Sequence, residues 1–387
     1  MSGTDPTLTT EWSLLRVAGS SGNGEEKQES LRALLRAPIC WKNLLDLAVH
    51  HGVQPLLYQS LSKVGESVPA TEMRALAQGH QANLHKALFL SRELIGIVNQ
   101  LSGSGIEVMP YKGVILAETL YGDIALRQAG DIDLFIRSAD LPRIRESVHE
   151  LGYVPHMFLS DAEEQAQLKS GYECAFDSAA GRNLLEVQWA IQPRFYAVDF
   201  DMDGLFRRGV IASVAGRPMK TPSAEDLFVV LSLHAAKHVW GRLIWLCDLG
   251  RLMQLRSLNW NWIGTQAKEL RIVRILRVGM LLANRLLAAP IPAIADASLP
   301  QDFTAVELAD EFQRRIASHE THSTESAAYF RLMLRLREGK ADRLRFLSRL
   351  IFTPGPGEWK AIGLPRPLFP LYRMVRLSRL AARLVRN

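Results

Sequence analysis

The sequence predicts an α+β fold, in which a small mixed β-sheet core is flanked by an N-terminal and a C-terminal helical region. Two observations predict the helices: apolar residues recur every three or four positions over residues 28–105, and again after residue 222. A third predicts the sheet, because short strand-like runs occur within residues 106–221. The order of these segments along the chain gives the fold class.

Composition limits the class of protein. The 387 residues are enough for two or three domains, and 48% hydrophobic with 22% charged residues is ordinary for a soluble globular protein. No apolar run approaches the roughly 20 residues of a membrane span, and we see no signal-peptide pattern. Cys40, Cys174 and Cys247 form neither a metal-type spacing nor a disulfide framework. We therefore expect a cytoplasmic protein with no transmembrane segment.

Five regions follow from these patterns. We expect a flexible N-terminus (1–27), an N-terminal helical region (28–105), the sheet core (106–221), a C-terminal helical domain (222–340) and a basic tail (341–387). Within the first helical region, helices are expected at 41–51, 55–64 and about 71–101.

The core region is expected to contain four pairs of elements. A strand at 106–111 leads into a helix at 114–122 that Gly122 closes, and a strand at 131–136 leads into a helix that Ser138 caps and Gly152 ends. Hairpins are expected at 172–191 and 209–220. Beyond the core, Ser223 followed by Asp226 is a capping-box pattern that opens a helix, and helices follow at 242–255, 273–289 and 307–319.

Asp131 and Asp133 interrupt an apolar run. In a strand both carboxylates point to one face, where like charges repel each other. Such a pair can hold one or two Mg²⁺ or Mn²⁺ ions for phosphoryl transfer. Glu186, the one acid in "LLEVQWAI", is the candidate third carboxylate. The alternatives are an ordinary pair of Asp residues at a strand end and a solvent-facing Glu186.

Candidate phosphate ligands precede the Asp pair. Lys112 and Gly113 lie at a strand-to-helix turn, where Gly allows close backbone approach and the helix N-terminus offers free N–H groups. Arg127 can clamp a phosphate through two hydrogen bonds. The alternatives are a surface Lys112 and an Arg127 that pairs with Asp131.

The stretch "YKGVILAETLYGDIALRQAGDIDLFI" resembles the core of the DNA polymerase β-like nucleotidyltransferase superfamily. More closely, it resembles a bacterial group labelled uncharacterised nucleotidyltransferases, which has Lys-Gly, Leu-Tyr-Gly, Arg and Asp-Ile-Asp in this order. The likeness extends to "WKNLLDLAVHHGVQPLLY", "HAAKHVWGRLIWLCDLGRLM" and "FTPGPGEWKAIGLPRPLFPLYRMVRLSRL". The resemblance thus runs from about residue 30 to the end of the chain.

The resemblance implies transfer of a nucleoside monophosphate from an NTP such as ATP to an acceptor hydroxyl, with Mg²⁺ or Mn²⁺ as cofactor and pyrophosphate as product. It places Asp131 and Asp133 as metal ligands, Glu186 as the third carboxylate, and Lys112 with Gly113 at the phosphate turn. The chain departs from the broader pattern in having Val114 after Gly113. It has Gln188 where the closer group often has His, so no imidazole role is expected at that position.

"HAAKH" places His234 and His238 on one helix face with Lys237 beside them. We expect Lys237 to contact the NTP phosphates. Zinc binding by the histidines and their ordinary packing within the fold are the alternatives. Asp248 is expected to pair with Lys237 or His238 in a structural role.

The tail is strongly basic. Residues 331–387 hold 14 Lys and Arg against three Asp and Glu, a net charge of +11, so the rest of the chain carries −5 of the total of +6. Arg373, Arg376, Arg379, Arg383 and Arg386 form one stripe of a predicted helix. The stripe suits an anionic partner, either RNA or a membrane surface. The alternative is an apolar face docked on the protein with solvated arginines.

Three hypotheses for the function follow. The leading one is a metal-dependent nucleotidyltransferase whose acceptor is a protein, a small molecule or RNA. The second is a non-catalytic module that binds a nucleotide or a partner on the same fold. The third is a toxin-like enzyme that modifies tRNA, which the basic tail would suit.

Overall fold

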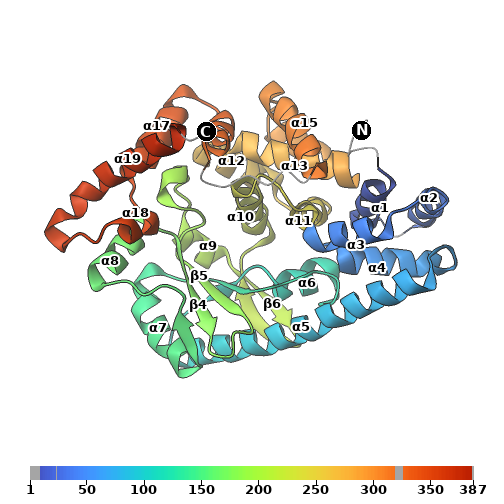
Figure 1. Ribbon diagram of the computed structural model, residues 1–387, viewed down its shortest axis with the longest axis horizontal. Helices are drawn as coiled ribbons and strands as arrows, with labels where there is room; N and C mark the ends of the chain where they lie inside the picture. Colours follow the sequence, from blue (N-terminus) through green and yellow to red (C-terminus); the bar gives the residue numbers. More distant parts are fainter. Residues whose placement is uncertain (1–8, 23, 319–325, 386–387) are drawn as a thin grey trace.

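The computed structural model describes residues 9–22, 24–318 and 326–385. Figure 1 shows the long helix α5 (Ala70–Gly103) along one side of the molecule and a five-stranded sheet against it. On the other side of the sheet lie helices that include α10 (Ala224–Lys237) and α11 (Leu243–Met253). The fold is α+β, with a small mixed sheet flanked by helices, as the sequence predicts.

The sheet has the strand order β1-β2-β5-β4-β3. Its strands are β1 (Met109–Pro110), β2 (Ile132–Phe135), β3 (Tyr153–Pro155), β4 (Glu173–Ser178) and β5 (Leu184–Gln188). Strands β2 and β5 are parallel, and the other neighbours are antiparallel. The predicted hairpin of β4 and β5 is confirmed, whereas β3 was not predicted.

The two faces of the sheet differ in polarity because strand side chains alternate. Ile132 and Leu134 of β2, with Leu185 and Val187 of β5, are buried in a cluster with α5 and α7 (Leu141–Glu150). Asp133 is therefore on the opposite face. There it pairs in register with Glu186 of the parallel neighbour β5. We call this side of the sheet the carboxylate face.

Four helices precede α5: α1 (Thr10–Gly19), α2 (Glu25–Leu35), α3 (Trp41–His50) and α4 (Gln54–Leu61). The expectation of a flexible N-terminus is wrong for α1, where Trp12, Leu14 and Leu15 are at most 1% exposed. These apolar residues lie on one face of a short helix. The helix was not predicted because polar segments flank it on both sides and the apolar repeat is short. Residues 1–8 and 23 lie outside the described part of the chain.

Smaller elements complete the core region. They are α6 (Val114–Tyr121), α8 (Asp161–Ser170), α9 (Met202–Arg208) and the hairpin of β6 (Val210–Val214) and β7 (Arg217–Thr221). Gly122 closes α6 in the left-handed conformation, as predicted. The cap predicted at Ser138 is wrong, because residues Ser138–Asp140 form a 3-10 turn and α7 begins at Leu141 with Pro142 in its first turn.

The helices after α11 are α12 (Trp260–Leu270), α13 (Val273–Leu287), α14 (Ala293–Ser298), α15 (Phe303–Ala317), α16 (Ala327–Arg335), α17 (Lys340–Phe352), α18 (Pro356–Ala361) and α19 (Tyr372–Val385). Ser223 caps α10 by accepting from the Asp226 N–H, which confirms the predicted start of that helix. Apolar residues of the N-terminal helices and of α10 to α17 form one continuous cluster. The two helical regions therefore share a core.

None of the helices in the described ranges is both long enough and apolar enough to cross a bilayer.

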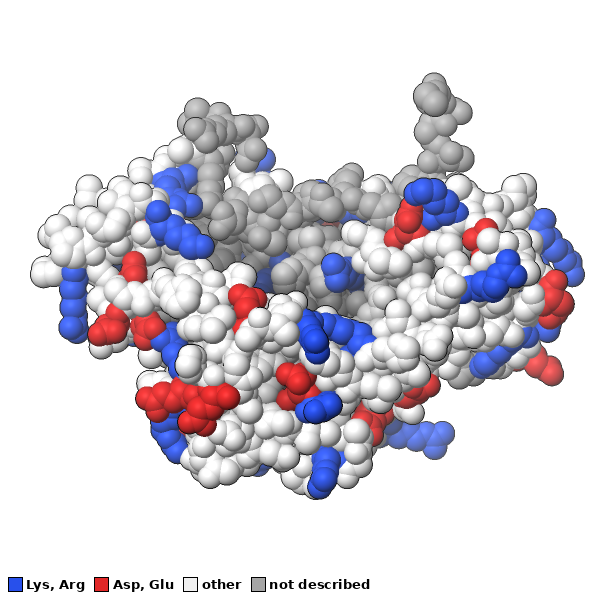
Figure 2. Space-filling model, turned by 60° about the horizontal axis from the view of Figure 1, so that its bottom comes forward, with Lys and Arg blue, Asp and Glu red and all other residues white. Residues whose placement is uncertain are grey.

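At least four arginines of the basic tail form ion pairs within the protein, and two of them, Arg345 and Arg349, pair with Asp199. Arg376 and Arg379 both lie within ion-pair distance of the buried Glu358, at 3.2 and 3.5 Å. Leu371 and Met374 of the same segment are 44% and 65% exposed, so the alternative of a docked apolar face with solvated arginines is wrong for these residues. Arg383 and Arg386 have no described side chains. Figure 2 shows Lys and Arg interspersed with Asp and Glu on the face that it presents.

Candidate active site

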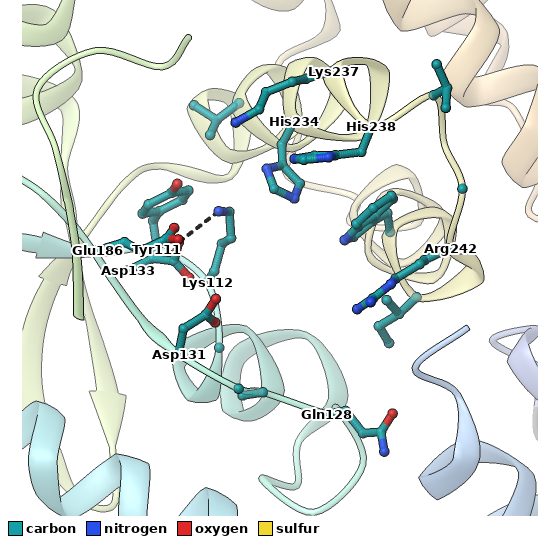
Figure 3. Close-up of a pocket in the computed structure, with 18 of the residues that line it drawn as sticks. Tyr111, Lys112, Gln128, Asp131, Asp133, Glu186, His234, Lys237, His238 and Arg242 are labelled. Atoms are coloured by element: carbon teal, nitrogen blue, oxygen red, sulfur yellow. Dashed lines mark hydrogen bonds and ion pairs between the residues drawn. The ribbon is translucent and has the colours of Figure 1, made fainter. Parts of the chain in front are cut away.

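A cavity of about 680 Å³ lies between the carboxylate face and the helices α10 and α11. Asp131, Asp133, Lys112 and Gly113 line it from the sheet side, and Lys237 lines it from α10. Figure 3 shows the carboxylates and Lys112 on one side of the cavity and His234, Lys237, His238 and Arg242 on the other. The fold therefore brings the predicted site residues around one space.

The three predicted carboxylates converge although Glu186 is about fifty residues from the other two. Asp133 and Glu186 are paired in register on parallel strands, and Asp131 comes two residues before Asp133. Burial and the neighbouring Asp133 raise the pKa of Glu186 to about 8, and the same two causes raise the pKa of Asp131. Each of these carboxyl groups thus opposes the ionisation of its neighbours.

Lys112 supplies the nearest counter-charge. Its Nζ lies 2.8 Å from Asp133 Oδ1, and both side chains are nearly buried. Burial alone would lower the pKa of Lys112, but the Asp133 carboxylate outweighs it and the net pKa is raised. Asp133 Oδ2 is buried and accepts no hydrogen bond from the described residues. Lys112 is therefore a buried site residue, which excludes the surface-lysine alternative.

Tyr111 fixes the strand from which Lys112 projects. Its ring stacks on Phe135 with centroids 3.9 Å apart, and its hydroxyl donates to Gln188 Oε1 at 2.7 Å. Gln188, where the related group often has His, thus has a positioning contact. Sequence analysis missed Tyr111 because the contact depends on sheet register.

Gly113 forms the turn between Lys112 and α6. Its φ of +59° with ψ of −129° is a conformation that side chains oppose, and an added Cβ would lie 3.3 Å from the Asp131 backbone oxygen. The predicted strand–turn–helix arrangement is confirmed, with α6 beginning at Val114. The turn therefore brings two site segments into close backbone contact.

Arg127 is almost fully buried and donates to both oxygens of Asp248, at 2.9 Å from Nε and 2.9 Å from Nη2. Tyr121 also donates to Asp248, at 2.7 Å. The suggested Arg127–Asp131 pair is therefore wrong, as are the suggested partners of Asp248. A direct phosphate contact by Arg127 stays a prediction, and Nη1 lies 3.5 Å from the Gly113 oxygen.

Lys237 projects from α10 toward the carboxylates (Figure 3). It bonds the Tyr172 hydroxyl, which in turn bonds Glu173, and its Nζ lies 4.5 Å from the Tyr172 ring centroid. Burial lowers the pKa of Lys237 despite the attraction of Glu173. Tyr172 was not predicted as a site residue, because its local sequence does not distinguish it from other aromatic residues near strand ends.

The two histidines form an aromatic group with Trp245 of α11. The His238 and Trp245 ring centroids lie 5.4 Å apart, and the His234 ring is 4.9 Å from that of His238. Burial and the adjacent Lys237 lower the pKa of His238 to about 3, and burial with Lys112 lowers that of His234 well below its usual value. Both rings are neutral at pH 7.

The chain after α10 turns sharply beside this group. Val239 and Trp240 have φ of +49° and +51°, and a β-branched residue in that region is strained. Val239 and Arg242 line the cavity, so the strained turn shapes its wall.

Across the described ranges, no group of three or more His, Cys, Asp or Glu side chains is placed so that it could hold a metal ion, so Asp131, Asp133 and Glu186 do not form a three-ligand metal cage. A cage is not required for Mg²⁺, which commonly takes one or two carboxylates and completes its shell with water and substrate phosphates. Asp133, with its unpaired oxygen, and Asp131 fit that donor set.

Comparison with known proteins adds one finding. A family model described as an uncharacterised nucleotidyltransferase matches residues 37–288. Neither the curated proteins nor the solved structures contain a match. The matched range covers the whole sheet, the cavity residues that precede α12 and well over half of the chain, whereas the likeness noted for residues 352–380 lies beyond it. The chain therefore belongs to the uncharacterised nucleotidyltransferase family.

Proposed function

We propose that the protein is a Mg²⁺-dependent nucleotidyltransferase of the DNA polymerase β-like superfamily. It moves a nucleoside monophosphate from an NTP to an acceptor hydroxyl, and pyrophosphate leaves. The observation that carries this proposal is the register of Asp133 with Glu186 on parallel strands, beside Asp131 and behind the Lys112–Gly113 turn. This arrangement combines metal-type carboxylates with a backbone turn suited to phosphate.

We place the metal with Asp131 and Asp133, while Glu186, in register with Asp133, serves as the base for the acceptor hydroxyl. A cation would relieve the repulsion between Asp133 and its neighbours Asp131 and Glu186, and one buried oxygen of Asp133 has no partner among the described residues. When bound, Mg²⁺ or Mn²⁺ would supply positive charge against the attacking and leaving oxygens.

The chain's own groups have distinct roles in the transfer. The acceptor oxygen bonds to the α-phosphorus, the bond from that phosphorus to the bridging β-oxygen breaks, and pyrophosphate takes the electron pair. Glu186 receives the hydroxyl proton. Lys112, the Gly113 turn and Lys237 hold the triphosphate, and Arg127 holds the turn through its contact with the Gly113 oxygen.

The nucleoside end of the NTP lies against Trp245 and His238. Their rings line the same cavity as the carboxylates, and neutral aromatic rings stack well on a nucleobase.

The three free cysteines, Cys40, Cys174 and Cys247, support a reducing, cytoplasmic setting.

Substitution of Glu186 by Gln tests the proposal. The variant keeps the shape of the side chain and removes its charge, so NTP affinity with Mg²⁺ should stay within a few-fold. Pyrophosphate release should fall about 10²–10⁴-fold, the usual contribution of a general base. Calorimetry measures the binding, and NTP labelled at the α-phosphate, incubated in cell extract, measures the transfer.

Glu269→Gln is the matched control, because Glu269 is exposed and lies outside the cavity. It should behave as the parent protein does. Full turnover by Glu186→Gln, or NTP affinity that is the same in EDTA as in Mg²⁺, would overturn the proposal.

A further inference from the structure

A second cavity of about 450 Å³ opens beside the first, where β3 has ended and the first half of β4 forms an edge of the sheet. The segment from Thr353 to Glu358, which includes the start of α18, closes its far side together with Arg376 and Arg379 of α19. Tyr172, Glu173 and Lys237 line both cavities, so these three residues form the wall between them.

The second cavity lies to one side of the three carboxylates. Across the sheet, Asp133 on β2 is followed by Glu186 on β5 and then by β4, where Ala175 pairs with Glu186. The second cavity lies on the β4 side. A molecule in it would therefore approach Glu186 from the side opposite to Asp131 and Asp133.

The chemistry of the walls is mainly aromatic and apolar. The side chains that give this character are Met157, Leu159, Phe176, Phe195, Tyr196 and Phe330. A cavity of this volume with apolar walls and a few polar groups is typical of sites for small organic molecules.

Three of the four Lys and Arg side chains that line the cavity are paired with carboxylates, and the fourth, Lys237, bonds the Tyr172 hydroxyl. Arg145 is paired with Glu164, and Arg376 and Arg379 are both paired with Glu358. A polyanion such as RNA gains its affinity by replacing counterions on lysines and arginines that face solvent, which this lining does not offer. The lining therefore favours an uncharged ligand over a nucleic acid.

We propose that this second cavity is the acceptor site, and that the acceptor is a small molecule with an aromatic or apolar body and a hydroxyl group. The hydroxyl reaches past Tyr172 and Lys237 toward Glu186. This inference rests on the proposed nucleotidyl transfer, which supplies the second substrate. The C-terminal segment, which lies outside the matched family range, then determines the acceptor.

The experiment uses the full-length protein and 2-naphthol as the aromatic hydroxyl probe. Equilibrium dialysis measures its binding, and NTP labelled at the α-phosphate with Mg²⁺ measures transfer to it. Glucose and an oligouridine RNA are the competing acceptors. We expect 2-naphthol to bind and to be labelled at least tenfold faster than either competitor.

Thr353→Trp places a large side chain at the cavity wall and should weaken 2-naphthol binding at least tenfold. It should leave NTP affinity unchanged, because Thr353 does not line the first cavity. Thr304→Trp is the matched control, since Thr304 is similarly half-buried and lines neither cavity. Both measurements on this control should match the parent protein.

The outcomes separate the two proposals. Failure of NTP to bind with Mg²⁺ would overturn the proposed function, whatever 2-naphthol does. If NTP binds normally, the proposed acceptor site is overturned by any one of three results. These are that 2-naphthol does not bind, that it binds Thr353→Trp equally well, or that it binds without being labelled. Preferred labelling of glucose or RNA overturns it too.

Discussion

Replacing Arg127 by Met should cost about 3–5 kcal/mol of the free energy of unfolding, the usual loss when one partner of a buried ion pair is removed. The side chains of Arg127 and Asp248 are 7% and 1% exposed. Without the guanidinium, the described contacts leave the Asp248 carboxylate only the Tyr121 hydroxyl as a donor. A domain is typically stable by about 5–15 kcal/mol, so the loss is a large fraction of the total.

The size of the effect depends on the uncompensated charge, and a double variant isolates it. Arg127→Met combined with Asp248→Leu removes both charges from the core. It should therefore cost less than the sum of the single variants, by up to about 3 kcal/mol of coupling. Urea unfolding followed by tryptophan fluorescence measures all three variants.

Lys42→Met is the control, because Lys42 and its partner Asp46 are 87% and 64% exposed. It should leave the unfolding midpoint unchanged. If Arg127→Met matches this control in stability, the buried-pair reasoning is refuted. A loss of NTP affinity at unchanged stability would instead support direct phosphate binding by Arg127.

Two further predictions concern the turn before the Asp pair. Gly113→Ala should weaken NTP binding in calorimetry and cost about 1–3 kcal/mol of strain, because Gly113 has a φ of +59° and the new Cβ would press on the Asp131 oxygen at 3.3 Å; unchanged affinity would contradict this. Lys112→Met removes the cation bound to Asp133, so Mg²⁺ should raise the melting temperature of this variant more than that of the parent protein. Equal shifts in thermal scans would show that the metal does not replace the lysine's charge.

Local patterns predicted the elements whose determinants are close in sequence. Gly122 ends α6, Ser223 caps α10, and β4 and β5 form a hairpin, each within a few residues of its signal. The Asp pair was equally visible, since strand alternation predicts that Asp131 and Asp133 share a face, although β2 begins at Ile132 and Asp131 directly precedes it.

Contacts between distant segments were not predictable. Arg127 and Asp248 are 121 residues apart, and the sequence suggested other partners for both. The contact of Tyr111 with Gln188 depends on β2 lying between β1 and β5, which no local pattern specifies. The sequence indicated Glu186 as a candidate. Its position beside Asp133 could not be predicted, because it depends on the parallel pairing of β2 and β5.

Helix α5 has a mechanical consequence for the whole molecule. Its 34 residues span about 50 Å at 1.5 Å per residue. Leu76 near its start belongs to the helical core, whereas the residues from Ala87 to Leu101 pack beneath the sheet. A continuous helix transmits displacement along its axis, so the N-terminal helices and the sheet cannot loosen independently. We therefore expect the helical core and the cluster beneath the sheet to unfold in one cooperative step, because α5 contributes residues to both.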